Sequence, residues 1–242
     1  MMGEKRTHVS SVSQPDAPGV SLVQPREYVL VAPGESSCGT RAADLAIAEP
    51  WASLPHFVCG APVPEYECAT RPSSRGIVMN PDGTLLLATT DELHEFVFSG
   101  GEIEHGETDL AALVREVEEE TGWLVDEATA RPILSIDDYH TRDAMRLSMR
   151  QVNRYFVCQA RPGGSMHLDK YEAVAGLHAV TCSLDDAIAA NEAILAQRRY
   201  FWVERDTFVL KLIRDRREEF GFWLRRSVPS SSTRSCGGSA VR

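Results

Sequence analysis

Apolar residues gather in short runs that are interrupted by turn residues and by a few amphipathic segments. Gly76–Asn80 and Leu85–Thr90 are two such runs, and Asn80-Pro81-Asp82-Gly83 between them is typical of a tight turn. Further strands are expected at Glu27–Ala32, Phe96–Phe98, Pro132–Ile136, Val152–Gln159 and Leu177–Ser183. Helices are expected at Thr40–Trp51, Thr108–Thr121, Asp185–Leu195 and Trp202–Phe220. This order predicts an α/β fold with a mixed sheet between helices, and not a sequential βαβ wind.

The two ends of the chain differ in composition from its middle. Residues 1–25 are rich in Ser, Pro and Val without periodicity, and the last residues are rich in Ser and Gly. We therefore expect an N-terminal extension over residues 1–60, partly disordered, and a disordered tail over residues 227–242. Residues 61–226 would form one domain with a C-terminal helix. Whether that helix covers the domain's own core or a second copy in a homodimer stays open.

The helix expected at Thr108–Thr121 has two different faces. Thr108 is a good N-cap, and Gly122 stands where a left-handed C-cap belongs. The apolar residues Leu110, Leu113, Val114 and Val117 share one stripe. A neighbouring stripe carries Glu116, Glu119 and Glu120. Solvated helices often carry such glutamates, but the cluster also supplies the oxygen ligands that Mg²⁺ and Mn²⁺ prefer.

The segment before this helix makes the metal interpretation stronger. Residues 98–107 (FSGGEIEHGE) form a glycine-bearing loop that leads directly into the helix. Glycines let backbone carbonyls approach a ligand closely. A loop with exposed carbonyls followed by a carboxylate helix is a plausible two-part metal cage.

The same segment, Gly101–Trp123, resembles the Nudix box, G-x5-E-x7-R-E-U-x-E-E-x-G-U, in which U is a bulky apolar residue. Every fixed position is filled in register: Gly101, Glu107, Arg115, Glu116, Val117, Glu119, Glu120, Gly122 and Trp123. The wider resemblance extends from about Tyr66 to Arg217. It implies a Nudix-type α/β/α sandwich and a pyrophosphohydrolase that cleaves a diphosphate linkage in a nucleoside diphosphate joined to another group.

The resemblance also implies roles for individual residues. Glu116, Glu119 and Glu120 would bind Mg²⁺ or Mn²⁺, and the Gly100 carbonyl would be a further ligand. Arg115 would orient the glutamates, and Glu107 would act beside the metal or help to polarise water. In this family the metal bridges the diphosphate oxygens and activates water for attack on phosphorus. Two departures are Ser99, where the family often has Pro, and Trp123, which is larger than the usual aliphatic residue.

The box does not specify a general base. Our candidate is Glu172, which follows Tyr171 shortly before the strand expected at Leu177, although a solvated glutamate is an equally good interpretation. Asp137 and Asp138 are weaker candidates. Cations for the outer phosphate could come from arginines of the predicted strands and loops, namely Arg71, Arg75, Arg142, Arg146 and Arg154. Tyr139, His140 and Phe96 could stack a base, with core packing as the default interpretation.

The composition of the chain limits the kinds of binding partner and cellular location to be expected. The formal net charge is -10, which argues against general affinity for DNA or RNA but not against a small phosphorylated nucleotide-like substrate. None of the six cysteines forms a CxxC pair, so reduced thiols are expected, and a zinc site at His56, Cys59 and Cys68 lacks a fourth ligand. Neither a secretory signal nor an apolar stretch of the roughly 20 residues that span a bilayer is visible. We therefore expect a cytoplasmic protein.

Two classes of function remain after the motif has been identified. The first is metal-dependent hydrolysis, which the complete set of box carboxylates favours. The second is a non-catalytic nucleotide or metabolite sensor on a Nudix scaffold, which would often lack box glutamates or add a DNA-binding module. The sequence shows no convincing helix-turn-helix partner for the last helix.

Overall fold

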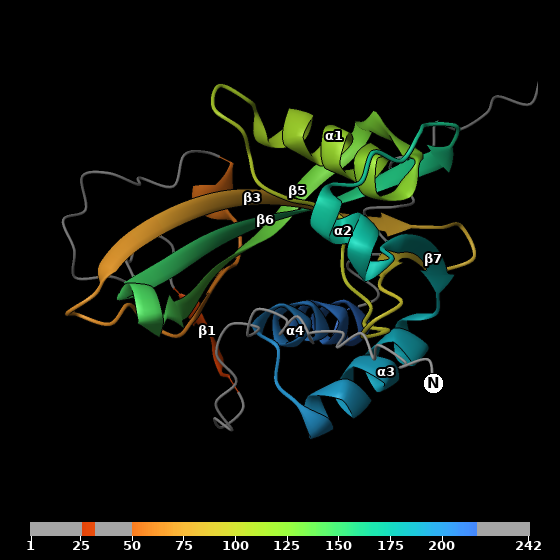
Figure 1. Ribbon diagram of the computed structural model, residues 1–242. Coiled ribbons are helices and arrows are strands. Elements are labelled where there is room, and N and C mark those ends of the chain that lie inside the picture. Colours follow the sequence, from red (N-terminus) through yellow and green to blue (C-terminus); the bar gives the residue numbers. More distant parts are fainter. Residues whose placement is uncertain (1–25, 32–49, 217–242) are drawn as a thin grey trace, which may run out of the picture.

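The computed structural model describes residues 26–31 and 50–216, and Figure 1 shows their arrangement. The strands are β1 (Tyr28–Val31), β2 (His56–Cys59), β3 (Glu67–Met79), β4 (Leu85–Thr89), β5 (Trp123–Arg142), β6 (Leu147–Pro162) and β7 (His178–Cys182). The helices are α1 (Asp109–Thr121), α2 (Lys170–Ala175), α3 (Leu184–Gln197) and α4 (Phe201–Asp215), with short 3₁₀ turns at Trp51–Ser53 and Asp143–Met145.

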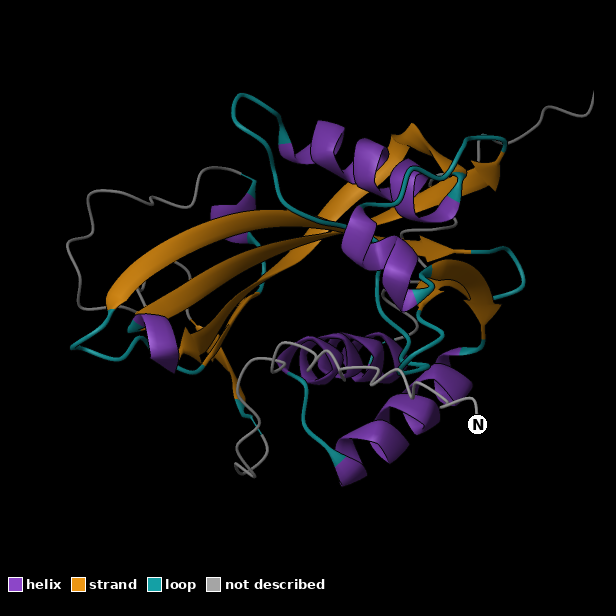
Figure 2. Ribbon diagram, in the orientation of Figure 1, coloured by secondary structure: helices purple, strands orange, loops and turns teal. Residues whose placement is uncertain are grey.

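The strands form one mixed sheet in the order β1-β2-β5-β6-β3-β4-β7. The pairs β2/β5 and β3/β6 are parallel, and the other neighbouring pairs are antiparallel. Figure 2 shows α1 over one face of the sheet and α3 and α4 on the opposite side. The expected α/β sandwich with a mixed sheet is confirmed.

Side chains alternate between two cores because successive residues of a strand point to opposite faces. In β6, Tyr155 and Val157 belong to the core under α3 and α4, whereas Phe156 and Cys158 belong to the core under α1. The same alternation separates Ile77 from Val78 in β3 and Leu85 and Leu87 from Leu86 in β4. The sheet is therefore buried on both faces near the box helix.

The described part of the N-terminal region belongs to this sheet. β1 pairs with β2, and β2 pairs with β5, so both strands extend the sheet beyond β5. Tyr28 of β1 stacks on Phe208 of α4 with ring centroids 4.4 Å apart. Most of the expected helix Thr40–Trp51, the leader over residues 1–25 and the tail over 227–242 lie outside the described residues. The domain boundaries at residues 60 and 226 stay predictions.

Several elements differ from the sequence-based expectation. Phe96–Phe98 is not a strand, since Val97 makes only an isolated bridge to Ala88. β5 and β6 are much longer than the apolar runs within them, because the two strands pair with each other along most of their length. A short helix, α2, was not expected. Asp169 caps it by accepting hydrogen bonds from the backbone of Tyr171 and Glu172.

Among the described residues, no helix is long and apolar enough to cross a membrane.

Candidate active site

The box helix α1 is capped at both ends as its sequence predicts. The Thr108 hydroxyl accepts a hydrogen bond from the Ala111 backbone N–H at 3.1 Å. Gly122 adopts a left-handed conformation with φ 69°, and its N–H donates to the Glu118 carbonyl at 2.8 Å. Leu113 and Val117 are fully buried against the sheet. The packing stripe thus fixes the rotation of α1, so that its neighbouring carboxylate stripe faces the glycine loop.

The glycine loop runs along β3 and is bonded to it. The Gly76 N–H donates to the Ser99 carbonyl at 2.9 Å, and the Ser74 N–H donates to the Gly101 carbonyl at 3.0 Å. At Gly100 φ is 145°, and a Cβ would lie 2.7 Å from the Arg75 Cα and closer still to the Ser74 carbonyl oxygen. Only glycine fits this approach of the loop to β3.

At Gly101 the nearest neighbour is a side chain and not backbone. A Cβ at this position would lie 2.5 Å from both Cδ and Oε2 of Glu116. The Glu116 carboxylate therefore occupies the space that a side chain at Gly101 would fill. Carboxylate and loop backbone are in direct contact at this point.

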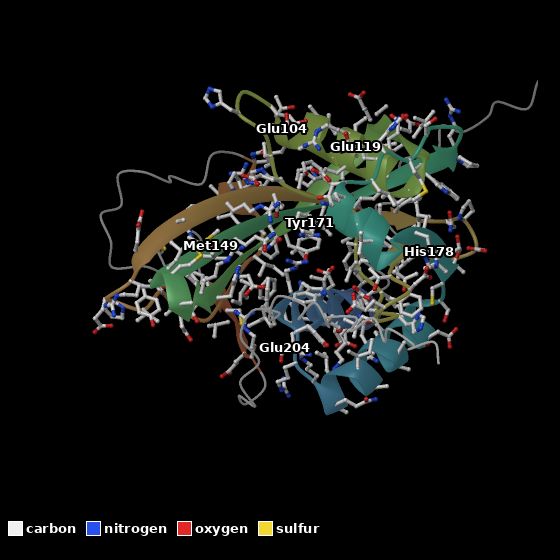
Figure 3. All side chains as sticks on the ribbon, viewed as in Figure 1. Glu104, Glu119, Met149, Tyr171, His178 and Glu204 are labelled. Carbon is white, nitrogen blue, oxygen red and sulfur yellow. The ribbon has the colours of Figure 1, made fainter. Side chains whose placement is uncertain are left out.

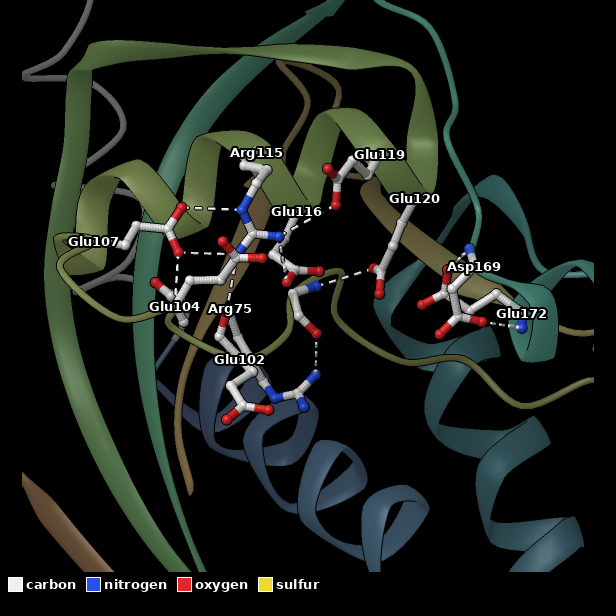
Figure 4. A network of polar contacts seen from close by, with 12 residues as sticks. Arg75, Glu102, Glu104, Glu107, Arg115, Glu116, Glu119, Glu120, Asp169 and Glu172 are labelled. Atoms are coloured by element: carbon white, nitrogen blue, oxygen red, sulfur yellow. Dashed lines mark hydrogen bonds and ion pairs between the residues drawn. The ribbon is translucent and has the colours of Figure 1, made fainter. Parts of the chain in front are cut away.

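Glu120, one turn further along α1, also contacts the backbone of the glycine loop. Its Oε2 accepts a hydrogen bond from the Gly100 N–H at 3.0 Å, which Figure 4 shows. Burial raises the pKa of Glu120 to about 8, the Arg75 guanidinium opposes this shift, and the Glu116 charge adds to it. Burial also raises the pKa of Glu116. Both carboxylates are thus disfavoured in their charged forms, which is the condition that a bound cation would relieve.

Arg115 is the centre of the remaining box residues (Figure 4). Its guanidinium binds both oxygens of Glu107 at 2.9 Å, and its Nη1 donates to Glu116 at 2.8 Å and to Glu119 at 3.2 Å. Its Nη2 also donates to the Glu102 carbonyl at 2.9 Å. The hydrogen bonds from Arg115 lower the pKa of Glu107, so Glu107 is held ionised. Arg115 therefore ties the loop, Glu107 and two box glutamates together.

The donor set fits a hard divalent cation in its chemistry. Glu116 lies against Gly101, and Glu120 accepts from the Gly100 N–H, so two carboxylates meet one short stretch of the loop. The Gly100 carbonyl of the same stretch accepts from Arg75 and offers a further oxygen. Glu119 is turned toward Arg115, and its side chain is 37% exposed. Over residues 26–31 and 50–216, no three acidic, histidine or cysteine side chains form a ready-made metal cage. The glutamates contact Arg115 and loop backbone instead.

Glu172 lies in α2 beside the carboxylate helix. The α2 region is bonded to α1 through the His167 N–H, which donates to the Glu119 carbonyl at 2.8 Å. The Glu172 charge is one of the causes that raise the pKa of Glu120. The Glu172 carboxylate itself accepts a hydrogen bond from the Asp169 N–H at 2.8 Å and completes a capping box. The structure thus brings Glu172 near the box glutamates and also gives it a structural role.

The weaker candidates have partners elsewhere. Asp137 is fully buried in an ion pair with Arg150, and Asp138 is fully buried and pairs with Arg26 at 2.6 Å. His140 stacks on Phe201 with centroids 4.1 Å apart.

The candidate arginines are dispersed. Arg154 pairs with Asp109, Arg71 pairs with Glu102 at 2.8 Å, and Arg146 lies over the Tyr66 ring. Arg75 donates to the backbone of the glycine loop, with its Nη1 bonded to the Phe98 and Gly100 carbonyls at 3.2 and 3.1 Å.

Two residues beneath this loop had no signal in the sequence. Asn153 of β6 accepts a hydrogen bond from Arg75 Nε at 2.9 Å, and Asp206 of α4 accepts one from the Phe98 N–H at 3.0 Å. Both are fully buried. They are remote from the box in sequence, and only the fold brings them below it.

Comparison with known proteins gives a family match for the chain. The NUDIX domain family profile matches residues 69–205, more than half of the chain. A search of curated proteins found no match. Solved structures similar to the chain include a MutT NUDIX hydrolase from Burkholderia pseudomallei, with 18% identity, a TM-score of 0.36, and coverage of 48% of this chain and 85% of that one. An ADP compounds hydrolase has 20% identity, a TM-score of 0.43, and coverage of 69% and 80%. A NUDIX hydrolase from Nitrosomonas europaea has 18% identity, a TM-score of 0.35, and coverage of 55% and 93%.

The chain belongs to the Nudix hydrolase family. Membership implies hydrolysis of pyrophosphate linkages in small nucleotide-like substrates, and Nudix hydrolases generally use divalent metal cations.

Proposed function

We propose that this protein uses Mg²⁺ or Mn²⁺ to hydrolyse the diphosphate linkage of a nucleoside diphosphate joined to another group. One observation carries the proposal: Glu116 and Glu120 meet the Gly100–Gly101 backbone in a space that no other residue type would leave open. Half-buried carboxylates that face the same stretch of loop backbone gain nothing for the fold by themselves. Together with a backbone carbonyl they supply the oxygen donors that a hard cation prefers.

In this proposal Glu116, Glu119, Glu120 and the Gly100 carbonyl hold the metal. When bound, the cation would neutralise charge on the diphosphate oxygens and lower the pKa of a water molecule. Arg115 keeps Glu116 and Glu119 oriented through its Nη1, and Glu107 in turn fixes the guanidinium. Glu107 would also act beside the metal or help to polarise water.

Glu172 is our candidate for the base that removes a proton from the attacking water. Its position in α2, close enough to Glu120 to raise the pKa of that residue, supports this role. Its hydrogen bond to the Asp169 N–H uses Oε2, and the other oxygen has no such bond in the capping box. A carboxylate anchored in this way could accept a proton without losing its orientation.

The charge balance is consistent with a small anionic substrate. The chain has 35 acidic and 25 basic residues, so a diphosphate needs local cations in order to bind. Metal ions at the glutamates would supply them. A cytoplasmic location, a homodimer and the absence of nucleic-acid partners stay predictions from the sequence.

The test is a substrate panel with purified protein and either Mg²⁺ or Mn²⁺. The panel contains nucleoside triphosphates, nucleoside diphosphate sugars, dinucleotide polyphosphates and NAD-like compounds. We expect at least one compound to be cleaved at its diphosphate linkage. An inert panel with detectable nucleotide binding would favour the sensor function instead.

Variants of neighbouring glutamates test whether the activity found in the panel depends on the proposed metal ligands. Glu119→Gln and Glu120→Gln should each lower the observed activity by several orders of magnitude, because each removes a charged metal ligand. Glu118→Gln is the matched control, since Glu118 is on the same helix but faces Gly164, where a Cβ would lie 2.8 Å from its Oε1. Equal losses in all three variants would argue against the proposed ligand set.

A further inference from the structure

A buried polar network supports the glycine loop from beneath, and none of its members belongs to the Nudix box. Asp206 of α4 accepts the Phe98 N–H at 3.0 Å, and its other oxygen accepts the Tyr155 hydroxyl at 2.9 Å. Arg75 of β3 donates to the Phe98 carbonyl at 3.2 Å and to the Gly100 carbonyl at 3.1 Å. The loop backbone is therefore bonded to two different elements of the fold at the site where metal is proposed to bind.

Arg75 is itself held rigidly. It is 9% exposed, and its Nε donates to Asn153 Oδ1 at 2.9 Å. Asn153 is fixed in turn by the Ser73 hydroxyl, which donates to the same oxygen at 2.9 Å, and by its own amide, which donates to the Gln151 carbonyl at 3.2 Å. A planar guanidinium that is clamped at Nε presents Nη1 in one direction. That direction is toward the Gly100 carbonyl.

Both backbone polar groups of Gly100 are thus bonded. Its N–H donates to Glu120 Oε2 at 3.0 Å, and its carbonyl accepts from Arg75 (Figure 4). A carbonyl oxygen has two lone pairs, so a hydrogen bond from Arg75 leaves one for a metal ion. Mutation of a group that orients a metal ligand typically lowers metal affinity or activity by about 10- to 100-fold.

We propose that Arg75 is a positioning residue that orients the Gly100 carbonyl for the divalent metal, with Asn153 fixing its guanidinium. This inference rests on the proposed function, because it concerns the same metal site. In this inference Arg75 binds the loop backbone and does not bind the outer phosphate of the substrate. The inference also gives the buried arginine on β3 a function beside the box.

The test is a titration of the purified protein with Mn²⁺, followed by electron paramagnetic resonance of the free ion. Arg75→Lys keeps the positive charge but loses the fork that reaches Asn153 and the carbonyls together. We expect its Mn²⁺ dissociation constant to rise by about 10-fold or more, as for other residues that orient metal ligands. Arg131→Lys is the matched control, because Arg131 Nη1 also donates to two backbone carbonyls, of Ala128 and Ala130, remote from the box. Its dissociation constant should equal that of the wild type.

Folding is followed on the same preparations by circular dichroism, and titrations are done well below the melting temperature. If Arg75→Lys does not fold, the Mn²⁺ titration is repeated on Asn153→Ala. This variant removes the hydrogen bond to Arg75 Nε and leaves Arg75 itself in place. A folded Arg75→Lys or Asn153→Ala protein with the wild-type dissociation constant would overturn the inference. Failure of the wild type to bind Mn²⁺ would instead overturn the proposed function, so the two failures are distinguishable.

Discussion

Replacing Gly101 by alanine tests whether the space between loop and helix is reserved for a metal-binding carboxylate. The φ of Gly101 is not in the left-handed region, so the backbone accepts an alanine. The new Cβ would lie 2.5 Å from Cδ and Oε2 of Glu116. These atoms must retreat by about 1 Å or more to regain ordinary van der Waals separation. Glu116 has a flexible side chain, so we expect the fold to tolerate the change.

The functional consequence should be large although the structural change is small. A displacement of about 1 Å at a reacting centre can cost about 100-fold in rate. We therefore expect kcat on the best substrate of the panel to fall about 100-fold, with an increased Mn²⁺ dissociation constant. The melting temperature should change little, because the methyl group displaces the end of one partly exposed side chain.

Gly164→Ala is the matched control for this experiment. Its Cβ would lie 2.8 Å from Oε1 of Glu118, a neighbouring glutamate of α1 that is not a proposed ligand. Gly164→Ala should keep the wild-type Mn²⁺ affinity. The reasoning is refuted if Gly101→Ala retains both wild-type metal affinity and wild-type kcat while melting normally.

Three further predictions concern the base, the half-buried His140 and the core under α1. Glu172→Gln should lower kcat by about 10²–10⁴-fold, because glutamine cannot accept the proton. The melting temperature should not change, since glutamine still completes the capping box. Full activity of this variant would show that Glu172 is not the base. Burial lowers the pKa of His140 from 6.5 to about 4, so protonation of this side chain opposes folding. The stability that neutral His140 contributes is complete above pH 6.5 and is lost as the pH falls toward 4. Urea unfolding should show the wild type losing about 1–3 kcal/mol more than His140→Phe over that window, and parallel pH profiles would contradict this. Leu113→Ala, at a fully buried position of α1, should lower the free energy of unfolding by about 2–5 kcal/mol, and a loss well below 1 kcal/mol would show that α1 is less tightly packed than described.

The elements that sequence reasoning predicted well have their determinants within a few residues. Helix α1 was predicted from Thr108, Gly122 and the apolar stripe, and the structure confirms each of these. The turn at Asn80–Gly83 joins β3 to β4 as expected, with Gly83 at φ 87°. Helix α2 could have been found in the same way, since Asp169 and Glu172 have the spacing of a capping box.

The elements that it missed depend on distant partners. β5 continues through Asp137 and Asp138, which read as polar loop residues until Arg150 and Arg26 are known to pair with them. Phe96–Phe98 looks like a strand, but its backbone bonds to Asn191 and Asp206 of α3 and α4 in place of a full ladder. The contacts of Phe96 and Phe98 join residues about a hundred positions apart, so no local pattern predicts them.

The candidate site also has residues that a local pattern predicts and residues that only the fold brings together. The box residues and their spacing are local, so Glu107, Arg115 and the three glutamates could be named in advance. Arg75 was predicted only as one of several cations for phosphate. Its actual neighbours are the Gly100 carbonyl and Asn153, which come together only when β3, β6 and the loop are assembled.

Hydrolysis in ¹⁸O-labelled water tests the central claim most directly. The best substrate of the panel is incubated with Mg²⁺ and wild-type protein, and the products are analysed by mass spectrometry. We predict one ¹⁸O atom in a phosphate group of a product formed by cleavage of the diphosphate linkage, with turnover lost on chelation of the metal and in Glu120→Gln but kept in Glu118→Gln. Label in a non-phosphate product, or turnover that survives both chelation and Glu120→Gln, would contradict the account.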